Sequence, residues 1–167
     1  MTFDASEPFE RSKLDIKEEL AKGKYGCIHN ATYKSYQVVV KSSSGEENNE
    51  MLSREYKFLK ALQASNLTGI PKVSFKFKRE RKECFIMERL GTDLKTYVKN
   101  TRDKKLSLEI TLTLALQVLN ILRSIHGHGI VHSDVKTENL MLRTSDHKIT
   151  IYLIDFGLAS SFRREGC

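Results

Sequence analysis

The segment His132-Ser133-Asp134-Val135-Lys136-Thr137-Glu138-Asn139 is the most informative part of this 167-residue chain, together with Asp155-Phe156-Gly157. Asp134 and Asn139 are separated by four residues, and Asp155 directly follows the apolar run from Ile149 to Ile154. A carboxylate and an amide at this spacing, followed by a second carboxylate at the end of a strand-like run, indicate more than a polar surface loop. These three side chains are therefore the first candidates for a functional site.

The overall composition predicts a folded globular protein. The hydrophobic fraction is 40% and the charged fraction 29%, which excludes an intrinsically disordered chain. A chain of 167 residues can form one core, or two small lobes that share a cleft. No apolar run has the length of a membrane span, the first ten residues carry no signal pattern, and three widely spaced cysteines argue against a disulfide framework. We therefore expect a protein that stays inside the cell, in the cytoplasm, the nucleus or both.

The chain carries a formal net charge of +7, and basic residues cluster between residues 72 and 82. A solvated basic surface is the simpler interpretation. The alternative is attraction to acidic partners, such as acidic or phosphorylated peptides, nucleic acid or anionic lipid. Aromatic and basic residues do not alternate beyond this run in the way that would stack bases, so the sequence disfavours nucleic-acid binding.

The N-terminal part of the chain has β-strand character. Residues 1–13 are polar and aperiodic, so we expect a flexible arm, and three strand-like runs follow within residues 14–41. Between the first two runs, in residues 21–28, Gly23 and Gly26 would let backbone N–H groups approach a polyphosphate. The alternative is that these glycines serve only the turn of a β-hairpin.

A helix is predicted after the strand that ends at Lys41. Ser44 as N-cap and Glu47 three residues later form a capping box. The predicted helix carries Glu55 inside a stripe that is otherwise made by Met51, Leu52, Tyr56, Leu59 and Leu62. A carboxylate that faces a core needs a cation to offset its desolvation. The alternative is that Glu55 lies at the edge of the stripe, in solvent.

The chain then changes from strands to helices. Residues 73–78 alternate as a half-exposed strand, and residues 84–87 form the returning strand. Thr92 or Asp93 caps a short helix, and Ser107 caps a long one that we expect to be buried nearly all round. Glycines and histidines in residues 126–129 end it. A metal cluster of His126, His128 and His132 is disfavoured because no cysteine or carboxylate completes a structural spacing.

Three further segments resemble sequences of the eukaryotic protein kinase domain, and within it the casein kinase I and vaccinia-related kinase group: Gly69-Ile70-Pro71, Phe85 to Gly91, and Tyr152 to Ala159. With the 132–139 segment, the resemblance covers roughly residues 14–163. It implies a kinase-like α+β fold, with a β-rich N-lobe at residues 14–90 and a partial helical C-lobe at residues 91–167.

The resemblance implies an ATP site. Lys41 would contact the phosphates and pair with Glu55. The other contacts to ATP would come from Ala21, Gly23 and Gly26 in the turn, from Ile28, Val39 and Met141 against the adenine, from Met87 at the back of the pocket, and from the backbone of Glu88 and Leu90 at the adenine edge. Ala21 departs from the pattern G-x-G-x-x-G, because it stands where the first glycine should be.

The resemblance also assigns the chemistry. Asp134 would be the catalytic base, Lys136 would neutralise the transferring phosphate, and Asn139 and Asp155 would bind Mg²⁺. The Asp-x-Lys arrangement is similar to that of Ser/Thr kinases. The resemblance implies that the partners are ATP and protein substrates, among them acidic or pre-phosphorylated proteins. Ser133 replaces the arginine of H-R-D, and we expect regulation by loop phosphorylation not to work in the usual way.

Three functions stay open at this level. The first is a serine/threonine protein kinase of the casein kinase I type. The chain stops ten residues after Gly157, so we expect a truncated product or fragment, and an ATP-binding pseudokinase or regulatory fragment without phosphotransfer is the second. The third is a basic protein that binds nucleic acid or acidic surfaces through residues 72–82.

Overall fold

The computed structural model describes residues 8–145 and 148–162, and it divides the chain into two compact units. The first unit contains residues 1–60 and 72–89, and the second contains residues 61–71 and 90–167. Residues 61–71 thus group with the second unit, although the sequence placed them in the N-lobe. Two hydrogen bonds hold them there: Leu153 N–H donates to Gly69 O over 2.9 Å, and the His128 ring bonds Ser65 Oγ over 2.8 Å.

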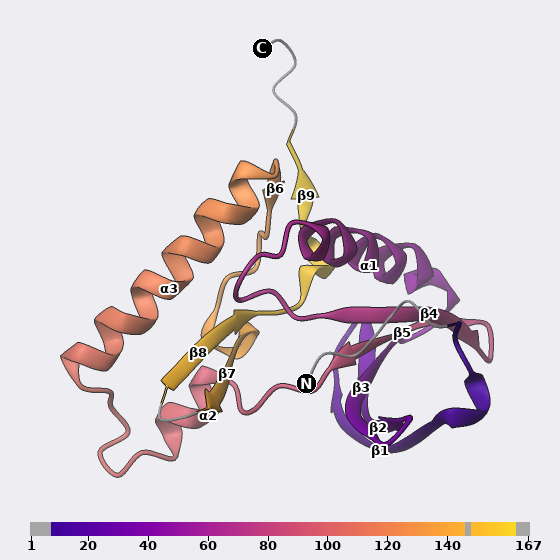
Figure 1. Ribbon diagram of the computed structural model, residues 1–167, viewed down its shortest axis with the longest axis horizontal. Helices are drawn as coiled ribbons and strands as arrows, with labels where there is room; N and C mark the ends of the chain where they lie inside the picture. The colour runs from indigo at the N-terminus through magenta and orange to yellow at the C-terminus, as the bar shows by residue number, and fades with distance from the viewer. Residues whose placement is uncertain (1–7, 146–147, 163–167) are drawn as a thin grey trace. The chain divides into compact units, whose positions relative to one another are not determined.

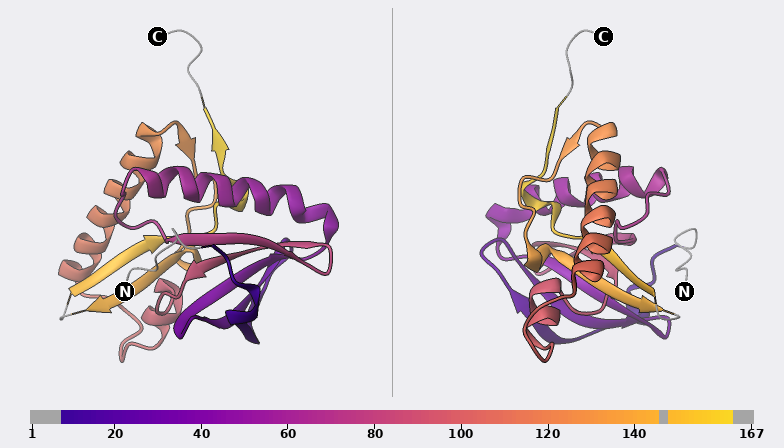
Figure 2. Two further views of the ribbon diagram at one scale, coloured as in Figure 1. Left: turned by 45° about the vertical axis from the view of Figure 1, so that its right-hand side comes forward. Right: turned by 90° about the vertical axis from the view of Figure 1, so that its left-hand side faces the viewer.

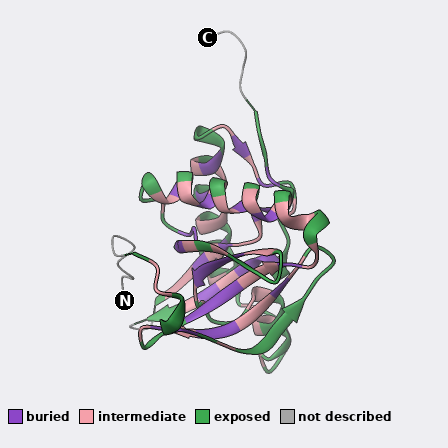
Figure 3. Ribbon diagram, turned by 90° about the vertical axis from the view of Figure 1, so that its right-hand side faces the viewer, coloured by how far each residue is buried: buried purple, intermediate pink, exposed green. Residues whose placement is uncertain are grey.

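The first unit is built on a five-stranded antiparallel sheet, shown in Figure 1. Its strands are β1 (Leu14–Lys22), β2 (Gly26–Tyr33), β3 (Tyr36–Ser43), β4 (Val73–Arg79) and β5 (Lys82–Glu88), in the spatial order β1-β2-β3-β5-β4. The strands predicted from runs within residues 14–41, from the alternation at residues 73–78 and from the returning run at residues 84–87 are therefore confirmed. Figure 3 shows the buried residues concentrated in the central strands, whereas β1 is exposed along most of its length.

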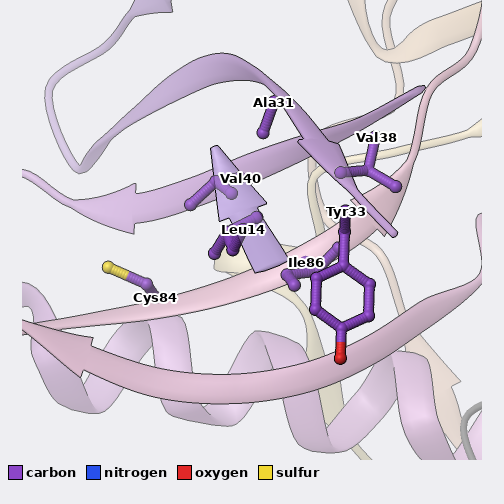
Figure 4. Packing of buried hydrophobic residues seen from close by; sticks show 7 residues of the cluster. All are labelled: Leu14, Ala31, Tyr33, Val38, Val40, Cys84 and Ile86. Carbon is purple, nitrogen blue, oxygen red and sulfur yellow. The ribbon is translucent and has the colours of Figure 1, made fainter. Parts of the chain in front are cut away.

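One face of this sheet carries an apolar core. Because successive side chains of a strand point to opposite faces, Val38 and Val40 enter this core while Val39 and Lys41 point to the other face. The buried members of the cluster, drawn in Figure 4, are Leu14, Ala31, Tyr33, Val38, Val40, Cys84 and Ile86. The aromatic ring of Phe9 covers this core, with its centroid 5.2 Å from those of Phe75 and Phe77.

The expected flexible arm is therefore wrong for its described residues. Phe9 packs on the sheet, and the short 3-10 helix η1 (Arg11–Lys13) leads directly into β1. Residues 1–7 of the predicted arm lie outside the described residues. The physical reason is that one aromatic side chain in a polar segment is enough to bury the segment's end against a row of rings.

The long helix of the first unit, α1 (Asn49–Ala64), begins later than predicted. Ser44 is not its N-cap: the 3-10 helix η2 (Glu46–Asn48) comes first, and Ser44 Oγ instead donates to Lys24 O over 3.0 Å. Asn49 occupies the start of α1, where its Oδ1 accepts from Ser43 Oγ and from Glu83 N–H. Long-range hydrogen bonds to β3 and β5 therefore decided where the helix starts, which the local capping pattern did not contain.

The apolar stripe of α1 faces the sheet, as the periodicity predicted. Leu52, Leu59 and Leu62 are buried. Tyr56 packs its ring against Phe85, with centroids 5.6 Å apart, and its hydroxyl donates to Ser74 O over 2.7 Å. This packing holds the helix against β4 and β5 (Figure 1).

The second unit combines two helices with short strand pairs, seen from two sides in Figure 2. Its elements are α2 (Leu94–Lys99), α3 (Leu108–Gly127), β6 (Ile130–Val131), η3 (Thr137–Asn139), β7 (Leu140–Ser145), β8 (Lys148–Leu153), η4 (Phe156–Leu158) and β9 (Ser160–Ser161). β7 pairs with β8, and β6 pairs with β9. The predicted caps are confirmed, because Asp93 accepts from Thr96 N–H and Ser107 accepts from Ile110 N–H.

Helix α3 packs on one side only. Leu114, Ile121 and Ile125 are buried, and the Gln117 amide fastens the helix to β8 by bonds to Ile149 O and Ile151 N–H. The expectation of a helix buried nearly all round is wrong, since four leucines of the opposite face are exposed: Leu108, Leu112, Leu116 and Leu119. The sequence pattern showed that both faces are apolar, but β6 and β8 pack against only one of them.

The same helix qualifies as a candidate membrane span by length and composition. Its best window has a mean hydropathy of 1.4 and is 17% buried. The expectation that no apolar run has the length of a membrane span was therefore wrong for this helix. Polar residues interrupt its leucines, but they are too few to lower the mean hydropathy of the window. A single such helix is weak evidence for a span, since the core helix of a water-soluble protein passes the same test.

Candidate active site

The predicted site residues fall into two groups, one in each unit. The first unit contains the glycine turn, Lys41, Glu55 and four of the residues expected at the adenine, Ile28, Val39, Met87 and Glu88. The second contains Leu90, the 132–139 segment, Met141 and Asp155. Each group is coherent by itself.

The glycine turn joins β1 to β2. Gly23 N–H donates to Gly26 O over 2.8 Å, and Ala21 stands opposite Ile28 in the β1–β2 ladder. A Cβ atom at Gly26 would lie only 2.6 Å from Ser42 O, whereas at Gly23 its nearest neighbour would be 3.7 Å away. Gly26 is therefore required by the close approach of β3, which the sequence pattern alone did not distinguish from a turn preference.

Lys41 and Glu55 form a buried ion pair. Lys41 Nζ lies 2.7 Å from Glu55 Oε1, and the side chains are only 12% and 3% exposed. The alternative of a solvated Glu55 is therefore wrong, because α1 turns this carboxylate toward β3. A lysine held in this way has its ammonium fixed at one place on the sheet, which suits the binding of a phosphate group.

Three apolar side chains line the same face of the sheet as Lys41. Val39 is paired with Met87 across β3 and β5, and both are buried, while Ile28 stands opposite Lys41 in the β2–β3 ladder. Glu88 contributes backbone and side chain to the edge of β5: its N–H donates to Lys72 O over 2.9 Å, and its Oε1 accepts from Lys72 N–H over 2.7 Å.

In the second unit, Asp134 is held by two neighbours within its own loop. Asn139 Nδ2 donates to both Asp134 Oδ2 and Asp134 O, over 2.9 and 2.8 Å, and Lys136 Nζ lies 2.7 Å from Asp134 Oδ2. The hydrogen bond to Asp134 raises the pKa of Lys136 above its ordinary value, so this ammonium stays charged. The arrangement is an oriented, partly exposed carboxylate next to a fixed cation.

The His132 ring links the loop to the residue that follows β8. Its Nδ1 accepts from Asp134 N–H over 3.2 Å, so its Nε2 carries the proton and donates to Ile154 O over 2.9 Å. The ring is buried edge-on against Phe156, and burial lowers the pKa of His132, although the bond to the Ile154 carbonyl opposes this shift. The sequence pattern included His132 but assigned it no role. The available signal was Phe156, an aromatic residue directly after Asp155.

The end of β8 is tied to the same loop. Ile154 N–H donates to Asn139 O over 2.9 Å, and Asp155 adopts a left-handed backbone conformation with φ 64° and ψ 72°. Together with the His132 bond, this brings the strand-end aspartate and the Asp134–Asn139 pair into one segment of the fold. Residues 14–167 match the family model of the protein kinase domain. This chain belongs to the protein kinase family.

A known protein shows the same relationship. Over 175 aligned residues the chain is 26% identical to a probable serine/threonine-protein kinase of Dictyostelium discoideum. The alignment covers 95% of this chain and 15% of that relative, so the chain spans about a seventh of the length of the curated protein that it matches. The kinase-like α+β fold expected from the sequence is confirmed.

The donor atoms of Asn139 and Asp155 in the second unit fit a divalent metal. Asn139 spends its amide nitrogen on Asp134, and within the described residues no group donates to its Oδ1, which leaves a carbonyl oxygen of the kind that Mg²⁺ prefers. Asp155 supplies a carboxylate in the same unit. Mg²⁺ is commonly held by one or two protein groups together with substrate phosphates, so these two side chains suffice. Among the described residues, no group of three or more histidine, cysteine or acidic side chains is placed to hold a metal ion.

Met141 and Leu90, two more residues predicted to contact ATP, lie on or next to the strands of the second unit. Met141, on β7, makes an isolated β-bridge with Asp93. Leu90 precedes Gly91, whose N–H donates to Leu142 O over 3.0 Å. The segment that follows β5 is thus fastened to β7.

One contact near the 132–139 segment was not predicted. Lys95 Nζ on α2 lies 2.8 Å from Glu138 Oε1, one residue before Asn139. The bond from Lys95, with help from backbone and from the Thr137 hydroxyl, lowers the pKa of Glu138 to about 2. The two residues are 43 positions apart, and no periodic pattern links them.

Proposed function

We propose that this chain forms the nucleotide-binding and catalytic part of a serine/threonine protein kinase, which transfers the γ-phosphate of ATP to a protein hydroxyl. The observation that carries the proposal is the arrangement around Asp134, whose carboxylate is bonded at once by Asn139 and Lys136. Phosphoryl transfer depends mainly on positioning and charge neutralisation, and this loop supplies both.

Each residue has a defined part in the reaction. Asp134 accepts the proton of the substrate hydroxyl, and its two bonded neighbours keep the carboxylate oriented. Lys136 offers its ammonium to the negative charge that develops on the transferred group. Lys41, held by Glu55, binds the phosphates of ATP. When bound, Mg²⁺ at Asn139 and Asp155 would neutralise phosphate charge.

Finer features of the proposal rest on resemblance. The Asp134-x-Lys136 spacing is similar to that of serine/threonine kinases, and three segments resemble the casein kinase I and vaccinia-related kinase group. We propose acidic or pre-phosphorylated protein substrates on this basis, and a location in the cytoplasm or nucleus. The resemblance in sequence supports these points, together with the excess of basic residues.

The test is phosphorylation of a casein-like substrate by purified protein with Mg-ATP. Asp134→Asn should abolish turnover while leaving the binding of ATP intact. Asp103→Asn is the matched control, because Asp103 is exposed and lies outside the predicted site. Full activity of the Asp134→Asn variant would show that another group acts as the base.

A second candidate is an ATP-binding module without phosphotransfer. Ser133, with a left-handed φ of 66° at the position where the kinase pattern has arginine, bears on regulation and favours neither candidate. A thermal-shift measurement separates the two: stabilisation by Mg-ATP without turnover supports the second candidate, and robust turnover rejects it.

The third function, a basic binding surface at residues 72–82, loses support. Four of its six basic residues lie near acidic side chains: Lys76 and Lys78 flank Glu83, Arg79 lies 3.5 Å from Glu80, and Arg81 lies 3.6 Å from Glu46. Charges that are already paired offer less to phosphates of a nucleic acid.

A further inference from the structure

The ion pair between Lys95 and Glu138 joins α2 to the catalytic loop. Both side chains are largely in solvent, 65% exposed for Lys95 and 45% for Glu138, so the pair is not part of a core. The contact is nevertheless specific, because Glu138 Oε1 accepts from Lys95 while Oε2 accepts from the Thr137 hydroxyl over 3.1 Å. Asp93 caps α2 and sets the start of the helix that carries Lys95.

The position of this pair exposes it to a bound substrate. A substrate hydroxyl that reaches Asp134 brings its flanking residues over the exposed part of the loop. The exposed residues there are Ser133, Val135, Lys136, Thr137 and Glu138. The loop has two carboxylates, Asp134 and Glu138. Asp134 is already bonded to Lys136, so Glu138 is the carboxylate that could attract a basic residue of a substrate.

Lys95 cancels that attraction. A carboxylate without a partner at this place would favour arginine or lysine next to the acceptor hydroxyl, because exposed opposite charges attract weakly but measurably. With Lys95 only 2.8 Å away, an incoming cation meets a neutral pair and must also compete with an ammonium that is already in place. An incoming carboxylate meets no net repulsion.

We propose that Lys95 is a specificity-determining residue that masks Glu138, so that the catalytic loop disfavours substrates with a basic residue beside the acceptor hydroxyl. The inference rests on the proposed kinase function and adds to it a pair of residues that sets the charge preference. Lys95 touches no reacting atom, and a purely structural tether between α2 and the loop would alter all substrates equally. The charge selectivity, and not the rate, is therefore the readout.

The test uses three peptides that differ at one position beside the acceptor serine: alanine, arginine or aspartate. In Lys95→Met, the ratio of kcat/KM for the arginine peptide to that for the aspartate peptide should rise roughly two- to fivefold, as for the removal of one exposed charge partner. Lys99→Met is the matched control, because Lys99 is an exposed lysine of the same helix and its loss changes the net charge equally. The double variant Lys95→Met/Glu138→Gln should return the ratio to that of the parent.

The ratio of binding affinities for the arginine and aspartate peptides tests this inference independently of the proposed kinase activity. Fluorescence anisotropy with serine-to-alanine versions of the arginine and aspartate peptides needs no turnover. Absence of phosphorylation by the parent protein would refute the kinase proposal, while the binding ratio would still decide the role of Lys95. A ratio that stays the same in Lys95→Met, that shifts equally in Lys99→Met, or that cannot be observed because neither peptide binds, overturns the inference.

Discussion

Replacing Lys41 by methionine removes the ammonium from a carboxylate that is only 3% exposed. Methionine keeps the apolar stem of the side chain, so the main loss is the charge 2.7 Å from Glu55 Oε1. Breaking a buried ion pair by removing one partner costs about 3–5 kcal/mol, because the other charge stays in a poorly solvated place. We expect the free energy of unfolding to fall by about that amount.

The double variant Lys41→Met/Glu55→Met tests whether the stability lost in Lys41→Met comes from the charge that stays on Glu55. Replacing both members of a buried pair by apolar residues of similar size is often nearly neutral. The double variant should therefore recover most of the stability lost by Lys41→Met, even though it removes more polar atoms. Its nucleotide affinity should stay low, because the proposed phosphate contact is absent in both variants.

Urea denaturation followed by circular dichroism measures these differences. Lys13→Met serves as control: Lys13 pairs with Glu10 at 2.9 Å, but both side chains are well exposed, and such a pair contributes at most about 1 kcal/mol. A Lys41→Met variant as stable as this control would refute the reasoning, since it would mean that Glu55 is solvated in solution. A double variant less stable than Lys41→Met would do the same.

Three further changes test other parts of the structure. Gly26→Ala should weaken Mg-ATP binding more than Gly23→Ala, measured by thermal shift, because only the former places a Cβ 2.6 Å from Ser42 O; equal effects would contradict the close approach. Ile125→Ala should cost about 2–5 kcal/mol in urea unfolding, and Leu116→Ala, 63% exposed, less than about 0.5 kcal/mol; similar costs would show that the leucine face is covered. Burial lowers the pKa of His132 below its unfolded value of 6.5, so the unfolded state binds more protons and stability falls as pH drops below about 6.5. His132→Gln should flatten this slope between about pH 7 and pH 5, and an unchanged slope would assign it to other groups.

Much of the first unit followed from short-range patterns. Strand-like apolar runs placed β2 and β3 correctly, and in β3 Val38, Val39 and Val40 are buried on both faces of the sheet. Periodicity over three and four residues placed the stripe of α1. The start of that helix was wrong by several residues, since Asn49 is held by hydrogen bonds from other strands rather than by a local cap.

Burial was harder to predict for α3. Its two faces are both apolar in sequence, and periodicity cannot tell which face another element covers. The structure shows Leu114, Ile121 and Ile125 covered and Leu116 exposed. The same limit applied to Glu55, for which a buried and a solvated position were equally compatible with the pattern.

The segment from His132 to Asn139 contains in its own sequence the groups that we propose for the reaction: a carboxylate, a cation and an amide at short separations along one loop. The tertiary structure decided which distant partners these groups have. Lys41 meets Glu55 across 14 residues, Lys95 meets Glu138 across 43, and the His132 ring meets Ile154 O across 22. Residue spacing reports only which side chains share a face of one element. Contacts between elements depend on how the chain folds back: Lys95 reaches Glu138 from another helix, and His132, whose Nδ1 accepts from Asp134 N–H, bonds Ile154 O at the end of β8.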